Sequence, residues 1–265
     1  MNVHMNQAVV ARKISFAYIG ANRIPVPVLR GLTLNLNYGQ IVGLVGRNGS
    51  GKTTLLQVLC GRLKPQTGDV AVGSTTVVRS GRLVTRPRLA VISQRPDSSL
   101  APTMSVYENY ILASRTSPLN LRWSYSARNV MSCRELLARA GMGLEDKLKE
   151  QTRFLSSGQQ QALAIMLAML SDDPILFMDE PTAALDPISA AKILALAIFE
   201  IKQKQGCLVL VSHRIRDILE VCNRILILRN GVITQDISSD VHAVTEKELL
   251  GFIAGQDAAL GTEIR

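Results

Sequence analysis

Two kinds of hydrophobic pattern divide this chain. Short apolar runs at residues 40–46, 89–93, 175–179 and 208–212 have the length of buried strands, and helical periodicity follows each of them. Strands that alternate with helices in this way predict a parallel sheet with helices on both faces. The sequence therefore favours an α/β fold with a mainly parallel core.

The first third of the chain predicts a small antiparallel β-subdomain beside that core, because apolar and polar side chains alternate there. Its expected strands are residues 11–18, 29–36, 70–72 and 75–78, with turns at Asn37-Tyr38-Gly39 and Gly73-Ser74. Near the other end, Asn230-Gly231 is typical of a two-residue hairpin turn and joins residues 224–228 to residues 232–235.

Between residues 96 and 155 the strand patterns stop. Residues 106–115 and 127–140 have helical periodicity instead, which predicts an inserted helical subdomain. We expect a single domain over residues 1–240, with a core of residues 1–96 and 164–240 and a helical subdomain of residues 97–163. Residues 241–265 would form a short C-terminal tail with one weak helix at residues 246–253.

Composition narrows the class of protein. Hydrophobic residues make up 47% of the 265 residues and aromatic residues 4%, so we expect an aliphatic core that is stable without cross-links. The four cysteines lie far apart without a C-x-x-C pair, which argues against disulfides and zinc and favours a reducing cytosol. Residues 1–13 contain no apolar stretch long enough for a secretory signal. The longest apolar run, residues 162–170, is about half of the ~18 residues that a membrane-spanning helix needs.

The formal charge of +9 admits nucleic acid, an anionic membrane surface or bound polyphosphate as a partner. The basic residues form no dense tract and have no interleaved aromatic side chains. This pattern favours a solvated basic face near a membrane over a surface that binds nucleic acid.

Residues 46–54 match the phosphate-loop pattern G-x-x-x-x-G-K-[ST] between an expected strand and an expected helix. Glycines allow backbone N–H groups to wrap the phosphates of a nucleotide, and the N-terminus of the following helix favours the same anion. Lys52 would reach the phosphate oxygens, and Thr53 would offer its hydroxyl to Mg²⁺. The alternative is a chance glycine-rich turn, which the strand–loop–helix order disfavours. The expected nucleotide contacts are Gly46, Arg47, Asn48, Gly49, Ser50, Gly51, Lys52, Thr53 and Thr54.

Two further segments carry candidate chemistry. Asp179 and Glu180 end an apolar strand, at the carboxyl edge where α/β sheets bind their ligands. Asp179 would hold Mg²⁺, and Glu180 would polarise the attacking water. Residues 155–159 (LSSGQ) precede a helix expected to run to about residue 171, whose N-terminus is a second anion site. Taken alone, the acidic pair is weak evidence for a catalytic site. A serine before a helix is also compatible with an ordinary helix cap that binds no anion.

These three segments resemble the Walker A loop, the signature motif and the Walker B strand of the ATP-binding cassette transporters, and the similarity extends from about residue 10 to residue 236. The resemblance implies a P-loop ATPase that binds ATP and Mg²⁺. In that family each ATP lies between the Walker A loop of one subunit and the signature of the other, which implies a homodimer or a pair with a homologous ATPase. The contacts expected in trans are Ser156, Ser157, Gly158, Gln159 and Asp186.

The smaller motifs of the family can be matched as well. Tyr18 resembles the aromatic side chain that stacks on adenine, with Phe16 as the alternative. Gln94 resembles the Q-loop glutamine at the start of the segment that faces the membrane subunit, and His213 resembles the switch histidine that contacts the γ-phosphate. The expected catalytic residues are Glu180, His213, Gln94 and Lys52, and the expected Mg²⁺ contacts are Thr53, Gln94 and Asp179.

Three positions depart from the family pattern. Ser157 replaces the first glycine of the signature, where its side chain would crowd or recruit the γ-phosphate bound to the partner subunit. Residues 184–186 (ALD) resemble the D-loop of the family, with Ala184 where serine is usual. Gln160 replaces a common arginine without an obvious catalytic consequence.

The resemblance implies a peripheral ATPase on the cytoplasmic face of the inner membrane that drives separate permease subunits. Import of a small solute, with amino acids among the candidates, is favoured because the ATPase is a free-standing chain, and an extracytoplasmic solute-binding protein is then a further expected partner. The alternatives are an exporter or lipid-handling complex and a soluble non-transport ATPase that acts on DNA or ribosomes. No nucleic acid is expected as a partner.

Overall fold

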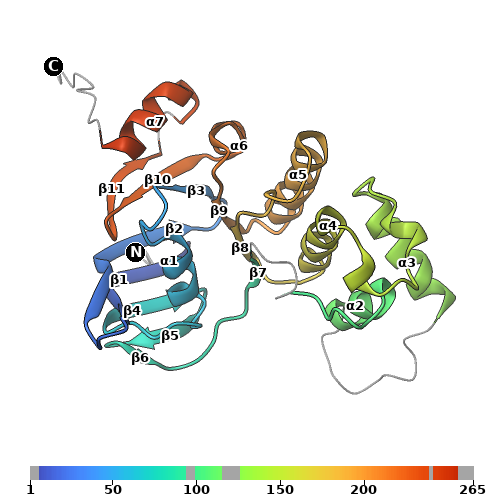
Figure 1. Cartoon of the computed structure of the whole chain (residues 1–265), viewed down its shortest axis with the longest axis horizontal. Coiled ribbons are helices and arrows are strands. Elements are labelled where there is room, and N and C mark those ends of the chain that lie inside the picture. Colours follow the sequence, from blue (N-terminus) through green and yellow to red (C-terminus); the bar gives the residue numbers. More distant parts are fainter. Residues whose placement is uncertain (1–5, 94–98, 115–125, 239–240, 256–265) are drawn as a thin grey trace. The chain divides into compact units, whose positions relative to one another are not determined.

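The computed structural model describes residues 6–93, 99–114, 126–238 and 241–255 (Figure 1). The chain divides into two compact units, and each is described by itself. One comprises Met1–Arg88 and Cys207–Arg265, and the other comprises Leu89–Gly206.

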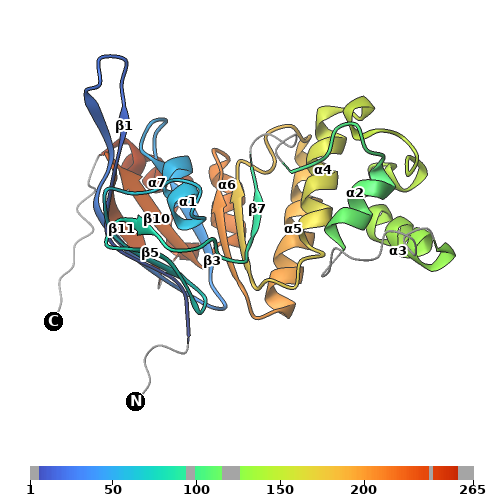
Figure 2. The same cartoon turned by 90° about the horizontal axis from the view of Figure 1, so that it is seen from below.

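The first unit contains an antiparallel sheet with the strand order β2-β1-β4-β5-β6. The strands are β1 (Gln7–Ile19), β2 (Pro25–Asn37), β4 (Thr67–Val72), β5 (Thr75–Arg79) and β6 (Arg82–Leu83). The predicted antiparallel subdomain is therefore confirmed, with β6 as an addition and longer first strands, whose hairpin projects from the sheet in Figure 2. The expected alternation is broken at Lys13, where a bulge with a φ of +50° leaves Arg12 and Lys13 both exposed.

Strands of a second, mainly parallel sheet lie in the same unit. They are β3 (Ile41–Val45), β9 (Cys207–Val211), β10 (Arg224–Arg229) and β11 (Val232–Ile237). β3 pairs in parallel with β10 and with β9, and β11 pairs antiparallel with β10. β3 and β9 are buried along their whole length, which explains their uninterrupted apolar sequences. The terminal hairpin is confirmed, and its first strand also joins the parallel sheet, which the sequence did not indicate.

In the described part of this unit the α-helices are α1 (Lys52–Leu59), α6 (Ile215–Val221) and α7 (Glu246–Ala254), and a short 3-10 helix spans Val241–Ala243. α1 packs against β2 and β4, and α7 packs against α6 and β10 (Figure 1). The weak helix predicted in the C-terminal tail is thus present as α7. Thr245 caps it through a reciprocal pair of hydrogen bonds with Glu248.

In the second unit, β7 (Ala90–Ile92) and β8 (Ile175–Asp179) pair in parallel. Its helices are α2 (Val106–Ala113), α3 (Ala127–Ala138), α4 (Ser157–Ala168) and α5 (Pro187–Gln203). α4 packs against α2, α3, α5 and β7, so it is buried on most sides. Helices α2 and α3 confirm the helical periodicity of the inserted segment.

The end of α4 corrects one prediction, because the helix ends at Ala168 rather than near residue 171. Oγ of Ser171 donates a hydrogen bond to the carboxylate of Asp173 (2.6 Å) and accepts one from the backbone N of Asp173 (3.2 Å). This local turn competes with the helix for the backbone. The ammonium of Lys204 also donates to the carbonyl oxygens of Met169 and Ser171, which satisfies acceptors at the end of the helix.

All four cysteines, Cys60, Cys133, Cys207 and Cys222, are buried and form no disulfide. Burial raises the pKa of each thiol to about 12. Because the thiolate is the reactive form, we expect iodoacetamide at neutral pH to modify none of them in the native protein and all of them after denaturation. Intact-mass measurement checks this, and rapid alkylation of a native thiol would contradict its burial.

Within the described residues, no helix combines the length and the apolar composition that a bilayer crossing requires.

Candidate nucleotide-binding site

Glycines shape the segment between β3 and α1. Gly49 and Gly51 adopt φ values of +79° and +106°, in the left-handed region that a Cβ disfavours. A Cβ on Gly46 would lie 2.2 Å from the carbonyl oxygen of Leu228, so no larger residue fits there. The glycine spacing of the predicted phosphate loop therefore follows from the path of its backbone.

The side chain of Lys52 lies along this loop. It is 8% exposed, and its ammonium donates hydrogen bonds to the carbonyl oxygens of Gly46 (2.7 Å) and Arg47 (3.2 Å). Helix α1 begins at Lys52 without a side-chain cap at Gly51. A buried cation beside an uncapped helix N-terminus is a combination that favours phosphate.

The two aromatic candidates beside the loop differ in exposure. Phe16 is 7% exposed and belongs to the core, whereas Tyr18 is 44% exposed. The hydroxyl of Tyr18 lies 3.3 Å from Oγ1 of Thr54, and its ring meets Phe16 edge to face with centroids 4.8 Å apart. These contacts hold Tyr18 beside the first turn of α1 with part of its ring accessible.

His213 reaches the same edge of the sheet as the phosphate loop. β3 and β9 are parallel neighbours, with Leu44 opposite Val211. Gly46 and His213 each follow two residues later, so they leave the sheet side by side, on strands about 4.8 Å apart. Oγ of Ser212 accepts a hydrogen bond from the backbone N of Arg214 (3.0 Å), which fixes the turn that carries His213. This supporting role of Ser212 was not predicted, although serine before a histidine at a strand end indicates such a turn.

In the second unit, β8 ends in the two predicted carboxylates. Asp179 is 9% exposed, and Glu180 follows it with a φ of +54°. Non-glycine residues in this region are strained, and such strain concentrates at functional sites. Gln94, which follows the neighbouring strand β7, lies outside the described residues.

The signature segment begins α4 with a capping box. Oγ of Ser156 accepts a hydrogen bond from N of Gln159 (3.2 Å), and Oε1 of Gln159 accepts one from N of Ser156 (3.3 Å). The side chain of Gln160 donates to the carbonyl oxygens of Thr152 (3.0 Å) and Leu155 (3.2 Å). Gln160 therefore anchors the start of α4, a structural role that the sequence did not indicate.

The D-loop contacts this helix directly. A Cβ on Gly158 would lie 3.0 Å from the carbonyl oxygen of Ala184, so the glycine permits a close approach. Oδ1 of Asp186 caps α5 by accepting hydrogen bonds from N of Ile188 (3.1 Å) and N of Ser189 (3.0 Å). Hydrogen bonding from Ser189, more than any other contact, holds the pKa of Asp186 below its usual value. The carboxylate that was predicted to act in trans thus also caps a helix.

The chain matches the family model described as ABC transporter over residues 29–183, more than half of its length. The chain belongs to the ABC transporter family. Within that family it is an ATP-binding cassette, and it is an ATPase that hydrolyses ATP to drive transport. The predicted fold, an α/β cassette with an N-terminal antiparallel sheet and a mainly parallel sheet flanked by helices, is confirmed.

Two relatives illustrate how the cassette compares with known proteins. It is 27% identical over 228 residues to a tyrosine transport ATP-binding protein of Clostridioides difficile, a match that covers 85% of this chain and 90% of the relative. It is 32% identical over 238 residues to an aliphatic sulfonates import ATP-binding protein of Paracoccus denitrificans, covering 89% of this chain and 86% of the relative.

Among solved structures, the cassette resembles the ATP-binding cassette MJ0796, determined as a dimer in a post-hydrolysis state with ADP and Pi. The TM-score is 0.73 at 24% sequence identity, over 87% of this chain and 98% of that one. This likeness concerns the fold.

Each unit of the cassette brings together part of the predicted site. In the first unit, Tyr18 and His213 lie beside the loop of residues 46–54. In the second unit, Gly158 of the signature packs on the D-loop, and the strand that ends at Asp179 runs beside the strand that precedes Gln94.

The departure at Ser157 is tolerated within the cassette because this residue is exposed at the first position of α4. We expect Ser157→Gly to raise the steady-state ATPase rate, since it removes a side chain that is expected to crowd the nucleotide bound to the partner subunit. Ala127→Gly is the control, because it weakens the first turn of α3 by about 1 kcal/mol, at least as much as Ser157→Gly weakens α4, without touching the signature. A lower rate for Ser157→Gly would instead show that the hydroxyl contributes to the site.

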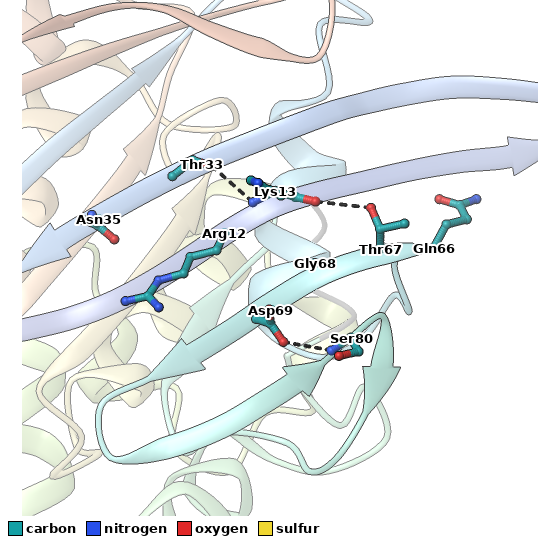
Figure 3. A pocket seen from close by; sticks show the side chains of 9 residues that line it. All are labelled: Arg12, Lys13, Thr33, Asn35, Gln66, Thr67, Gly68, Asp69 and Ser80. Atoms are coloured by element: carbon teal, nitrogen blue, oxygen red, sulfur yellow. Dashed lines mark hydrogen bonds between the residues drawn. The ribbon is translucent and has the colours of Figure 1, made fainter.

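A shallow concavity of about 740 Å³ lies on the solvent face of the antiparallel sheet (Figure 3). The bulge at Lys13 shapes it: N of Lys13 donates to Oγ1 of Thr33 (3.1 Å), and Oγ1 of Thr67 donates to O of Lys13 (3.2 Å). No predicted nucleotide contact is among its lining residues. It is therefore separate from the candidate site.

Proposed function

We propose that this cassette binds MgATP at residues 46–54 and hydrolyses it in a dimer, and that hydrolysis powers uptake of a small solute through separate permease subunits. The observation that carries the proposal is the register of β3 and β9. It sets the phosphate loop, with its buried Lys52, and the exposed His213 at one edge of the sheet.

The side chains of the first unit bind and sense the nucleotide. Lys52 would exchange its loop carbonyls for β- and γ-phosphate oxygens, and the first-turn amides of α1 would add hydrogen bonds to the same anion. Tyr18 offers an accessible ring for the adenine, and the burial of Phe16 favours Tyr18 over that alternative. His213 would donate a hydrogen bond to the γ-phosphate and so distinguish ATP from ADP.

Thr53 and Asp179 each offer an oxygen of the kind that Mg²⁺ prefers. Thr53 is exposed on the first turn of α1, and Asp179 carries a carboxylate at the end of β8. Mg²⁺ prefers one or two such ligands together with phosphate oxygens and water. The ion would neutralise charge that develops on the phosphates, while Glu180, and Gln94 by its place in the sequence, would orient the attacking water.

A dimer completes each site. The cap at Ser156 presents the N-terminus of α4, with Ser157 exposed beside it, as a second anion-binding surface. Two copies arranged with two-fold symmetry would place this surface of one copy, together with Gly158, Gln159 and Asp186, on the γ-phosphate held by the other. The γ-phosphate then holds the two copies together, and its loss releases them.

Uptake is favoured over export because the relatives described above are named for tyrosine transport and for import of aliphatic sulfonates. Since those solutes differ in chemistry, we propose a small solute and include amino acids in that class. The cassette would act as a peripheral subunit on the cytoplasmic face of the inner membrane. An extracytoplasmic binding protein would deliver the solute to the permease.

Affinity purification of the cassette from detergent-solubilised membranes tests this proposal. We expect permease subunits to co-purify, and cross-linking before solubilisation to capture a solute-binding protein. Recovery of an export complex, or of DNA or ribosomes bound in a steeply salt-dependent way, would contradict uptake.

A further inference from the structure

The turn between β10 and β11 contacts the phosphate loop directly. Asn230 and Gly231 form this turn with φ values of +50° and +80°. The backbone N of Gly231 donates a hydrogen bond to O of Ser50 (3.2 Å), and O of Gly231 accepts one from N of Arg30 (3.0 Å). Both backbone groups of one glycine thus tie the terminal hairpin to the phosphate loop and to β2.

No side chain fits at this junction. A Cβ on Gly231 would lie 2.1 Å from O of Val28 and 3.1 Å from Cα of Leu29. A Cβ on Gly51 would meet the side chains of the same two residues, each at 3.1 Å. Val28 and Leu29 are therefore in contact with the phosphate loop at Gly51 and with the hairpin turn at Gly231.

This contact fixes the direction of one peptide group of the loop. In a planar trans peptide, the C=O and the following N–H point in opposite directions. Because the carbonyl of Ser50 faces Gly231, the N–H of Gly51 points away from the hairpin. Backbone N–H groups are what such loops offer to a phosphate, so the orientation of this peptide matters for binding.

We infer that Gly231 is a positioning residue for the nucleotide site: it orients the peptide between Ser50 and Gly51 without touching the nucleotide. The inference rests on the proposed function, since it assumes that residues 46–54 bind the phosphates. It assigns the terminal hairpin, which carries no family motif, a part in nucleotide affinity.

Gly231→Ala tests the inference, with Gly73→Ala as the matched control. Gly73 lies in the β4–β5 turn with a φ of +55°, and a Cβ there would meet only the hydroxyl of Tyr38 at 3.3 Å. Both variants carry left-handed strain, so we expect both to lose thermal stability. Only Gly231→Ala should raise the Kd for MgADP, by about 10- to 100-fold, the effect of losing one hydrogen bond to a charged group.

Wild-type affinity in Gly231→Ala, or an equal loss in Gly73→Ala, would overturn the inference. Hydrogen exchange of the unmodified protein provides a second measurement in case Gly231→Ala does not fold. MgADP should slow exchange of the Gly231 amide, and unchanged exchange at saturating MgADP would also overturn the inference. If the wild-type protein itself binds no MgADP, the result contradicts the proposed nucleotide site rather than the role of Gly231 alone.

Discussion

Glu180→Gln is expected to lower ATP hydrolysis by about 10²- to 10⁴-fold, the contribution typical of a general base, while MgATP still binds. Glu180 follows the buried strand β8 in a left-handed conformation, which directs its side chain differently from that of Asp179. The amide has nearly the same size but cannot accept a proton from water. Hydrolysis should therefore stop with ATP in place, and the ATP-bound dimer should accumulate.

Phosphate release measures the rate, and size-exclusion chromatography with MgATP measures the dimer. Glu135→Gln is the matched control, because it changes an exposed glutamate on α3 of the same unit. We expect the control to hydrolyse ATP at the wild-type rate. An unchanged rate in Glu180→Gln would rule out its role in activating water.

Lys52→Ala is expected to weaken MgATP binding by about 10- to 150-fold, because each charge-assisted hydrogen bond contributes about 1.5–3 kcal/mol. The ammonium of Lys52 is buried beside the loop, so water cannot readily replace the hydrogen bonds that it would donate to the phosphates. The substitution also leaves the carbonyls of Gly46 and Arg47 without this donor, so some loss of thermal stability should accompany it.

Isothermal titration with MgATP measures the affinity, and thermal unfolding without nucleotide measures the separate effect on stability. Lys64→Ala removes an exposed lysine outside the loop and controls for the change in net charge. If both variants bind MgATP equally well, Lys52 is not a phosphate ligand.

Much of the fold follows from the sequence. The uninterrupted apolar runs at β3, β8 and β9 predicted buried parallel strands because both faces of such strands are covered. Asn230-Gly231 predicted its turn because two left-handed residues are needed there. These features depend on local conformation and on burial, both of which a sequence pattern records.

The features that the sequence did not indicate depend on contacts between distant segments. The bulge at Lys13 needs the hydroxyls of Thr33 and Thr67 on neighbouring strands. The helix α4 ends early because Ser171 forms a local turn and Lys204, far along the chain, binds the carbonyls of Met169 and Ser171 just beyond it. Such side-chain contacts leave no periodic signal in the sequence.

In the candidate site, too, local features could be predicted from the sequence, whereas contacts between distant segments could not. The phosphate loop and the acidic pair could be predicted from residue types and spacing. By contrast, the contacts that support them, such as the turn fixed by Ser212 and the bond from Gly231 to Ser50, depend on register across the sheet and its hairpin. Resemblance to a family readily identifies the residues that contact the ligand. It does not readily identify the residues that hold those contacts in place.

In the proposed dimer, one ATP is bound between the phosphate loop of one copy and the signature helix of the other. Asn48 and Ser157 are exposed on these two segments. All four native cysteines are buried, with the pKa of each thiol raised to about 12, so they should not interfere with cross-linking chemistry.

A direct test mixes Asn48→Cys and Ser157→Cys copies, each also carrying Glu180→Gln, and treats them with a short bis-maleimide whose spacer can span a bound phosphate. We expect a cross-linked dimer that forms with MgATP, requires both variants, and does not form without nucleotide. If the mixture binds MgATP but forms no cross-link, or cross-links equally without nucleotide, the shared site is contradicted.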